Sequence, residues 1–288
     1  MSLIARLRRG RGAAPGADRS VEAWLHHLHR GEAAPANHAD DPARTRLPLE
    51  AHKVRLRDLR RAAAPPTLGR EGFALVRHRS GVRDFDDLEE VQSVYLPEME
   101  RLLAALTGAP RAFALDRPIL RAETHARPGG PGILAEGTAR VVHTDYTPAS
   151  VRGAAAAAAQ RHGAGVPAGA RIAAFTLWRV LSPPPQDRPL ALCDLRSVRA
   201  EDLVVGRSYG NAGSPGYEGE FHLLRHRRRH RWGWFPDLDE GEVVVFRQHN
   251  SAITGPSACP HSAFADPRCP ADAPPRRSLE LRAFVIGG

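Results

Sequence analysis

The chain of 288 residues is long enough to bury one large core or two smaller ones. Hydrophobic residues make up 42% and charged residues 25% of it, which is ordinary globular usage and excludes wholesale disorder and fibrous repeats. No apolar run approaches the roughly 18 residues that a membrane-spanning helix needs. The net charge of +9 could indicate a nucleic-acid partner, but Lys53 is the only lysine and the arginines are scattered. Codon bias explains this pattern better, so an Arg-rich nucleic-acid-binding protein is the least favoured reading.

Residues 1–20 contain arginine, glycine, alanine and proline without periodicity, and we expect them to form a flexible tail. They lack the apolar segment of a secretory signal, although an Arg-rich, acid-poor start also resembles an organelle transit peptide. The cysteines at 193, 259 and 269 show no metal-type spacing, which suits a reducing compartment. The sequence therefore favours a cytoplasmic protein, and it leaves the oligomeric state open.

Taken in chain order, the first elements are mixed. A short helix is predicted at Val21–Leu28, and short strands are predicted at Val54–Leu59 and Phe73–Val76. The strongest helix prediction is Asp86–Leu106, which has an acidic first turn and apolar residues at helical spacing. Pro97 lies inside that segment and should kink or split the helix.

From about residue 111 the pattern changes to short apolar runs separated by turn residues, and a single helix is predicted at Ser150–His162. This pattern predicts a mainly β fold with flanking helices, built on a double-stranded β-helix, or jelly-roll, core. We expect one domain over residues 21–288, with a helical N-terminal extension at 21–110 and the core at about 111–288. The predicted strands are Val141–Val142, Ala173–Val180, Leu190–Cys193, Leu203–Val205, Phe221–Leu224, Trp232–Phe235, Val243–Phe246 and Leu279–Ile286.

The sharpest local motif is His143-Thr144-Asp145, which directly follows two valines. Side chains two residues apart on a strand point to the same side of the sheet, so His143 and Asp145 should converge. With one distant histidine they would make the two-histidine, one-carboxylate triad that holds non-haem Fe(II) and leaves coordination positions open for O2. The motif is short, and the alternative reading is a hydrogen-bonded pair at the end of a strand.

His261, 116 residues after Asp145 and just before the last predicted strand, is the favoured third ligand. His249 is the serious rival, because it follows the apolar strand Val243–Phe246 and can line a pocket. Three other histidines are weaker candidates, because they lie around an Arg-rich turn and are expected to face solvent. They are His222, His226 and His230.

The last predicted strand carries alternating polar side chains. Arg276, Ser278 and Arg282 share one side of it. An inward arginine with a hydroxyl group two residues further on can hold a carboxylate such as the far end of 2-oxoglutarate. An edge strand with its polar face in water is the alternative.

With these motifs in place, the sequence resembles the hydroxylase/desaturase family of Fe(II)/2-oxoglutarate-type oxygenases, typified by the cephamycin C-7 hydroxylase component and the aspergillic-acid-cluster hydroxylase. The resemblance covers roughly residues 50–286. The blocks that carry it include Arg70-Glu71-Gly72-Phe73, Tyr95-Leu96-Pro97-Glu98-Met99, His143-Thr144-Asp145-Tyr146-Thr147, Leu177-Trp178-Arg179, Pro260-His261-Ser262-Ala263-Phe264 and Pro275-Arg276-Arg277-Ser278-Leu279-Glu280-Leu281-Arg282.

The resemblance implies catalytic residues and cofactors. It places Fe(II) on His143, Asp145 and His261, and it assigns 2-oxoglutarate to Arg276 and Ser278, with Arg282 as a second candidate for the arginine. Two departures matter, because His249-Asn250-Ser251 stands where the family usually has Tyr-Asp-Ser, and Arg277 stands where the family is usually acidic.

A further set of residues is expected near the substrate. Tyr146, Thr147 and the helix after them are expected at the rim of the pocket or in a lid, and His249 in its wall. Arg179 is expected either in the pocket or in an ion pair with Asp194.

The expected function is oxidation of a small natural-product intermediate by O2 and 2-oxoglutarate, as a hydroxylase or as a desaturase or cyclase. A 2-oxoglutarate-independent iron oxygenase or a cupin-like metal enzyme is the alternative. Substrate identity and reaction outcome stay open.

Overall fold

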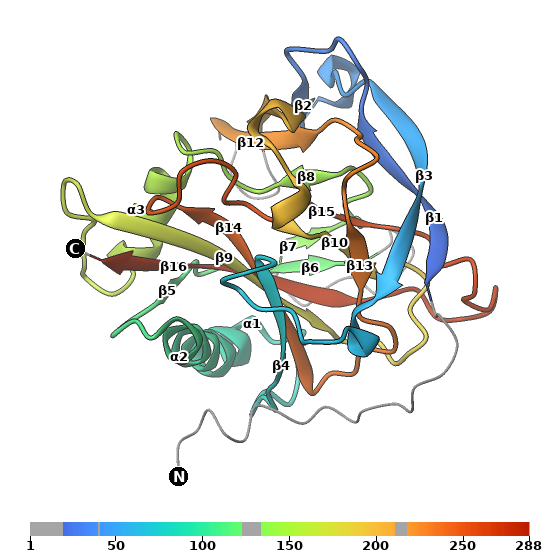
Figure 1. Cartoon of the computed structure of the whole chain (residues 1–288). Helices are drawn as coiled ribbons and strands as arrows, with labels where there is room; N and C mark the ends of the chain where they lie inside the picture. Colours follow the sequence, from blue (N-terminus) through green and yellow to red (C-terminus); the bar gives the residue numbers. More distant parts are fainter. Residues whose placement is uncertain (1–19, 40, 123–133, 211–217, 288) are drawn as a thin grey trace.

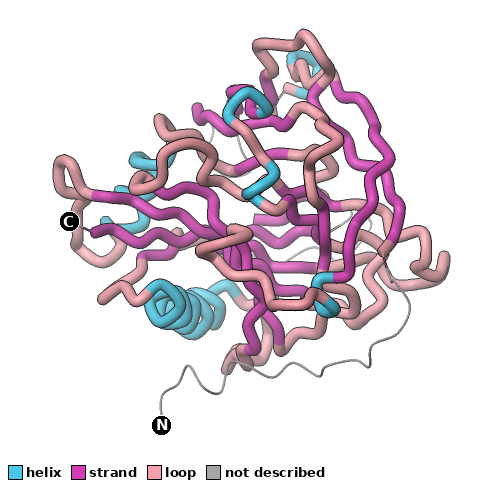
Figure 2. Tube along the Cα trace, in the orientation of Figure 1, coloured by secondary structure: helices cyan, strands magenta, loops and turns pink. Residues whose placement is uncertain are grey.

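Two β-sheets dominate the computed structural model, which describes residues 20–39, 41–122, 134–210 and 218–287 (Figure 1). The sheets are mixed and antiparallel pairing prevails, so the prediction of a mainly β protein with flanking helices is confirmed (Figure 2). The nine-stranded sheet has the order β1 (Val21–Leu28), β3 (Leu49–Asp58), β13 (Trp232–Trp234), β10 (Leu190–Cys193), β15 (His261–Ala263), β8 (His143–Thr144), β12 (Glu218–Leu224), β11 (Leu203–Tyr209) and β2 (Ala36–His38).

The seven-stranded sheet faces the first one and carries most of the helical cover. Its strands are β4 (Phe73–Arg77), β14 (Glu242–Asn250), β9 (Arg171–Val180), β16 (Ser278–Gly287), β6 (Ile119–Arg121) and β7 (Leu134–Glu136), with β5 (Phe113–Ala114) paired to β16. Short 3₁₀ turns lie at η2 (Pro42–Arg44), η3 (Leu59–Arg61), η5 (Leu195–Ser197) and η6 (Ala200–Asp202).

The helix predicted at Val21–Leu28 is wrong, because this segment is strand β1. It pairs antiparallel with β3 along its whole length. Val21, Ala23 and Leu25 are buried while the residues between them are exposed, and this period of two is the pattern of a half-buried strand. The predicted N-terminal extension therefore begins with strands and is helical only in its last part, at Leu88–Thr107. Its first strands form one edge of the nine-stranded sheet, and β4 ends the other sheet.

The helix predicted at Asp86–Leu106 is confirmed, in three pieces. They are α1 (Leu88–Glu90), a π-helical turn η4 (Val91–Tyr95) and α2 (Leu96–Thr107). Asp87 caps the start by accepting hydrogen bonds from two backbone N–H groups, and Gly108 ends α2 in the left-handed conformation. Pro97 lies in the first turn of α2, where a missing N–H costs nothing, so it divides the helix as expected.

Helix α2 covers the outer face of the seven-stranded sheet, with Met99 and Leu103 buried against Phe175 and Leu177 of β9. Helix α3 (Val151–Gln160) matches the second helix prediction, and its buried alanines pack on Phe284 of β16. The inner face of the same sheet meets the nine-stranded sheet in a second core of Trp178, Leu192, Val244 and Phe246. Helix α2 therefore covers the outer face of the sheet and α3 covers only one end of its inner face, so the rest of the inner face is free to build a site between the sheets.

The proposed tail, residues 1–20, lies outside the described residues except for Ser20. Among the described helices, none is long and apolar enough to cross a membrane.

Candidate metal centre

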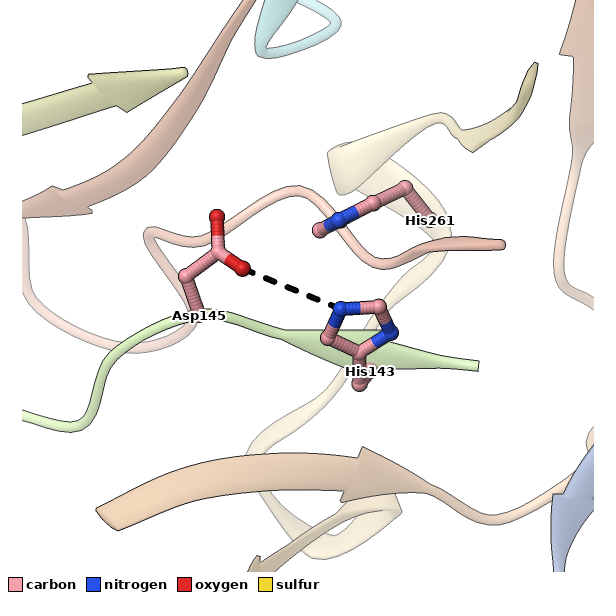
Figure 3. A group of neighbouring side chains, drawn as sticks. All are labelled: His143, Asp145 and His261. Atoms are coloured by element: carbon pink, nitrogen blue, oxygen red, sulfur yellow. Dashed lines mark ion pairs between the residues drawn. The ribbon is translucent and has the colours of Figure 1, made fainter. Parts of the chain in front are cut away.

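Strands β8 and β15 are hydrogen-bonded neighbours, and His143 lies directly opposite His261 in their register. Asp145 follows the end of β8 by one residue. One ligand atom from each of the three side chains lies within 4.8 Å of the other two, and the two imidazole rings are 4.3 Å apart. Figure 3 shows the three side chains turned toward one point. No other such group occurs in the described part of the chain.

Backbone carbonyl groups orient both imidazoles. Nδ1 of His143 lies 2.8 Å from the carbonyl oxygen of Val141, and Nδ1 of His261 lies 3.2 Å from that of Cys259. With each Nδ1 engaged in this way, Nε2 is the atom left for a metal. Burial, followed by the nearby His143, lowers the pKa of His261 to about 4. His261 is thus neutral at physiological pH, which is the form that binds metals.

Three groups hold Asp145 in place. Its Oδ2 accepts a hydrogen bond of 2.8 Å from the hydroxyl of Thr176 on β9, and its Oδ1 accepts one of 3.1 Å from Arg282 on β16. Its backbone N–H donates to Oε1 of Gln248 at 2.9 Å. Burial acts to raise the pKa of Asp145, but the opposing charge of Arg282 helps to hold it below its ordinary value, so the side chain stays a carboxylate.

Sequence reasoning missed Glu280 and Arg121, which complete a buried charge network with Arg282. Oε2 of Glu280 lies 2.9 Å from Nε of Arg121, and Oε1 lies 3.0 Å from Nη2 of Arg282. Against the effect of burial, the charges of Arg121 and Arg282 hold the pKa of Glu280 far below its usual range. The sequence feature that could have identified Glu280 is its position on the same side of β16 as Ser278 and Arg282.

Gln248 is a second missed residue. The pairing of β14 with β9 shifts register between Arg247 and His249, so Gln248 is an extra residue in a β-bulge. Besides supporting Asp145, its side chain lies 3.3 Å from Nδ1 of His261. A bulge depends on how two strands pair, and nothing in the local sequence predicted it.

A cavity of about 380 Å³ opens beside the candidate centre. His143, Asp145, Arg121 and Arg282 contribute to its wall. The remaining wall is partly apolar and includes Leu47, Ile119, Val141 and Phe221, with Glu220 also present. The volume is in the range of small-molecule sites.

The rival ligand His249 is buried but lies outside the group of three. Burial and the charge of neighbouring His222 lower its pKa. The expectation that His222, His226 and His230 face solvent is wrong for His230, which is buried, whereas His222 and His226 are half-buried. His230 in particular is buried with its Nε2 3.1 Å from Asp202.

Ser278 is the first residue of β16, and Arg276 lies two residues before it; both are on the inner side of the sheet. The guanidinium carbon of Arg276 is 5.2 Å from the ring centre of Trp178, and only 2% of the residue is exposed. The hydroxyl oxygen of Ser278 is buried with no hydrogen-bond partner among the described residues. Arg282, four residues further on, is engaged with Asp145 and Glu280.

Arg179 does not lie in the pocket. It is opposite Leu279 in the pairing of β9 with β16, on the outer face that α2 covers. Its guanidinium donates to the carbonyl oxygens of His78 and Glu240, and Asp194 instead pairs with Arg196 and Arg231. Both interpretations offered for Arg179 are therefore wrong.

Tyr146 and Thr147 lie behind the cavity wall rather than at its rim. Tyr146 packs against Phe284 in the core beneath α3. The hydroxyl of Thr147 donates to Oε2 of Glu220 at 2.9 Å, so it supports a residue that does line the cavity.

The donor set fits a divalent transition metal. Two imidazole nitrogens and one carboxylate oxygen suit Fe(II), whose two-histidine, one-carboxylate sites keep open positions. The carbonyl groups, Thr176 and Arg282 supply the outer contacts that such ligands require.

A profile of the family described as "Oxidoreductase/YMDC permease-like domain" matches residues 25–286. The chain belongs to this oxidoreductase family. Among curated relatives, the Fe(II)/2-oxoglutarate-dependent dioxygenase NvfI of Aspergillus novofumigatus is 29% identical over 249 residues, which cover 82% of this chain and 84% of that protein. The hydroxylase/desaturase EfuI of Hormonema carpetanum is 28% identical over 258 residues, which cover 84% of this chain and 86% of its own.

A solved structure shares the fold of this oxidoreductase. The iron and alpha-ketoglutarate-dependent endoperoxidase NvfI superposes with a TM-score of 0.74 at 26% identity, covering 93% of this chain and 98% of the other. The predicted jelly-roll fold is confirmed by this likeness. The expected resemblance to Fe(II)/2-oxoglutarate-type oxygenases is also confirmed, whereas a specific likeness to the cephamycin C-7 hydroxylase component finds no support among these relatives.

Proposed function

We propose that the protein is a mononuclear Fe(II)/2-oxoglutarate-dependent oxygenase that hydroxylates or desaturates a small natural-product intermediate. The observation that carries the proposal is the convergence of His143, Asp145 and His261 within 4.8 Å beside a ligand-sized cavity. The names of the relatives, which include a 2-oxoglutarate-dependent dioxygenase and a hydroxylase/desaturase, support the same class of reaction.

Fe(II) with 2-oxoglutarate would supply the activation of O2 and the oxidation of a substrate C–H bond. The two imidazoles and the Asp145 carboxylate would hold the ion from one side. Thr176 and Arg282 fix that carboxylate, because each donates to a different one of its oxygens. The protein's own contribution is therefore ligand geometry, a partly apolar cavity and the placement of substrate in it.

Arg276 and Ser278 would hold the far carboxylate of 2-oxoglutarate. The buried hydroxyl of Ser278 lacks a partner among the described residues, and a carboxylate oxygen would accept its hydrogen bond. A guanidinium fork can bind the same group in a bidentate manner. Arg282 is the weaker candidate for this role, because two protein carboxylates already engage it.

The test is anaerobic addition of Fe(II) and 2-oxoglutarate, followed by the weak visible charge-transfer band of the complex. His143→Ala, Asp145→Ala and His261→Ala should each abolish the band. His249→Ala is the matched control, since it removes a buried histidine outside the group of three, and it should leave the band intact.

Reaction with O2 and a panel of small natural-product intermediates then separates the alternatives. Stoichiometric succinate supports 2-oxoglutarate dependence, whereas substrate oxidation without succinate would support a 2-oxoglutarate-independent iron oxygenase. Loss of the band in His249→Ala, with the band retained in His261→Ala, would overturn the assigned ligand set.

A further inference from the structure

A second cavity, of about 450 Å³, lies on the opposite side of β3 from the core and is lined almost entirely by basic side chains. Lys53, Arg55 and Arg57 contribute from β3, and four arginines contribute from positions 227–231. His226, His230, Val54 and Trp232 complete the lining, and no carboxylate belongs to it. It shares no residue with the cavity at the candidate metal centre.

The strand pattern explains this concentration of charge. Val54 and Leu56 point into the core, so the alternate residues Lys53, Arg55 and Arg57 are exposed. Strand β13 runs parallel to β3, with Trp232 opposite Leu56. The loop that leads into β13 therefore runs beside β3 and adds its arginines to the same groove.

A buried carboxylate, that of Asp202, holds two arginines of this loop in place. Asp202 is fully buried. It pairs with Arg229 and with Nε of Arg227 at 3.2 Å, and it lies 3.1 Å from Nε2 of His230. Two guanidinium groups are thus held in place before any ligand arrives, which reduces the entropy that binding would cost.

The groove keeps an excess of positive charge. Lys53 pairs with Glu22 at 2.9 Å and Arg231 with Asp194 at 3.3 Å. Arg57 and Arg228 are exposed and form no ion pair with a carboxylate of the described residues. An anion in the groove would relieve the mutual repulsion of these groups.

An unpaired donor gives a second, independent indication of a ligand. Nε of Arg229 is a buried N–H group without a hydrogen-bond partner among the described residues. Arg229 lines the groove. A buried donor without an acceptor is costly, and an oxyanion at the base of the groove would supply the acceptor.

The extent of the groove indicates the class of anion. Lys53 and Arg57 are four residues apart on a strand, or about 13 Å, which is too far for one phosphate group to contact both. A larger cavity of about 630 Å³ shares Arg55, Arg57, Arg231 and Trp232 with it. This cavity adds apolar residues such as Leu59 and Phe73, and it also contains Asp58, Glu71 and Asp194, each beside arginines. The two cavities are neighbours along these shared residues, so a ligand with a charged head and a less polar tail can contact both.

We propose that this surface, called here the basic groove and formed by residues 53–57 and 226–232, binds an organic diphosphate. The phosphate groups lie over Arg57 and Arg228, and the organic part lies toward Leu59 and Phe73. The site is separate from the candidate metal centre and does not depend on the proposed oxygenase function.

The test is calorimetric titration of the full-length chain, freed of metal so that diphosphates cannot chelate iron, at a fixed ionic strength of about 0.15 M. Three probes are used, namely ADP, an isoprenoid diphosphate and inorganic pyrophosphate. ADP or the isoprenoid diphosphate should bind more tightly than pyrophosphate, and the tighter of the two organic probes identifies a nucleotide or a lipid source.

The double variant Arg57→Gln and Arg228→Gln should bind the tighter of the two organic probes at least tenfold more weakly. Its oxygenase activity and thermal stability should stay unchanged. Arg79→Gln combined with Arg117→Gln is the matched control, because it removes two exposed arginines outside both cavities; it should change affinity less than twofold. The proposal is overturned if neither organic probe binds, if pyrophosphate binds as tightly as both of them, or if the control loses as much affinity.

Discussion

The candidate metal centre and the basic groove differ in how completely their arginines are paired. At the metal centre, Arg121 and Arg282 are each paired with buried Glu280, and Arg282 also contacts Asp145. In the basic groove, Arg57 and Arg228 have no carboxylate partner among the described residues. The comparison teaches that the number of arginines in this chain says little about function. Whether an arginine is paired with a carboxylate distinguishes the structural arginines from those whose charge is available to a ligand.

The largest effect expected from this contrast is on stability, at Glu280. Glu280→Ala leaves the buried Arg121 and the half-buried Arg282 without their shared carboxylate, and breaking such a network costs up to about 3–5 kcal/mol. Urea unfolding should show this loss of free energy. The control Glu240→Ala removes an exposed carboxylate and should change the free energy of unfolding by less than about 0.5 kcal/mol. A loss below about 1 kcal/mol in Glu280→Ala would mean that the two arginines find solvent or other partners.

The next effect separates two arginines of one strand. Arg276→Ala should weaken 2-oxoglutarate binding about 100-fold, because a charge-assisted bidentate contact is lost, and leave Fe(II) affinity nearly unchanged. Arg282→Gln should do the reverse, with a loss of Fe(II) affinity of about 10- to 100-fold, because Asp145 loses an orienting contact. Titrations of each component, followed by the charge-transfer band, measure both constants.

Arg276→Lys sharpens this test, since it keeps the charge but not the fork and should recover part of the affinity. If Arg276→Ala and Arg282→Gln lose 2-oxoglutarate affinity equally and keep their Fe(II) affinity, Arg282 takes part in co-substrate binding.

A smaller effect is expected behind the basic groove, where the rings of His27 and His226 are 5.2 Å apart. Burial and then the proximity of His226 lower the pKa of His27 to about 3. The unfolded chain therefore takes up a proton near pH 6.5 while the folded chain does not, so this contribution to stability is present above pH 6.5 and is lost as the pH falls. Between pH 6.5 and 5 the loss from His27 is about 2 kcal/mol.

Urea unfolding at these two pH values should show a shallower loss in His27→Gln than in the native chain. His26→Gln, on the exposed side of the same strand, should keep the native slope. Equal slopes in the native chain and His27→Gln would show that His27 is not kept neutral by folding.

The smallest effect concerns the exposed pair of Lys53 and Glu22 at the rim of the groove. A double-mutant cycle with Lys53→Ala and Glu22→Ala should give a coupling free energy below about 1 kcal/mol, since water screens the pair. A larger coupling would contradict the description of this rim as a solvated surface.

Much of this architecture could be predicted from local pattern. Alternating apolar residues predicted the position of most strands after residue 111, and the spacing of His143 and Asp145 was sufficient to place both side chains on one side. The error at Val21–Leu28 shows the limit of this reasoning, because Leu25, Leu28 and neighbouring residues fit a short helix as well as a strand. Pairing with β3 decided between them.

The sequence by itself determined the chemistry available to this protein: a histidine and an aspartate two residues apart, a later histidine, and a final strand with arginine and serine on one side. These follow from residue identity and the period of a strand. Only the tertiary structure decided that His261 rather than His249 joins the pair, that Arg282 serves Asp145, and that Gln248 and Glu280 surround the centre. These contacts join strands far apart in sequence, and their geometry depends on register and on a bulge, which no local pattern encodes.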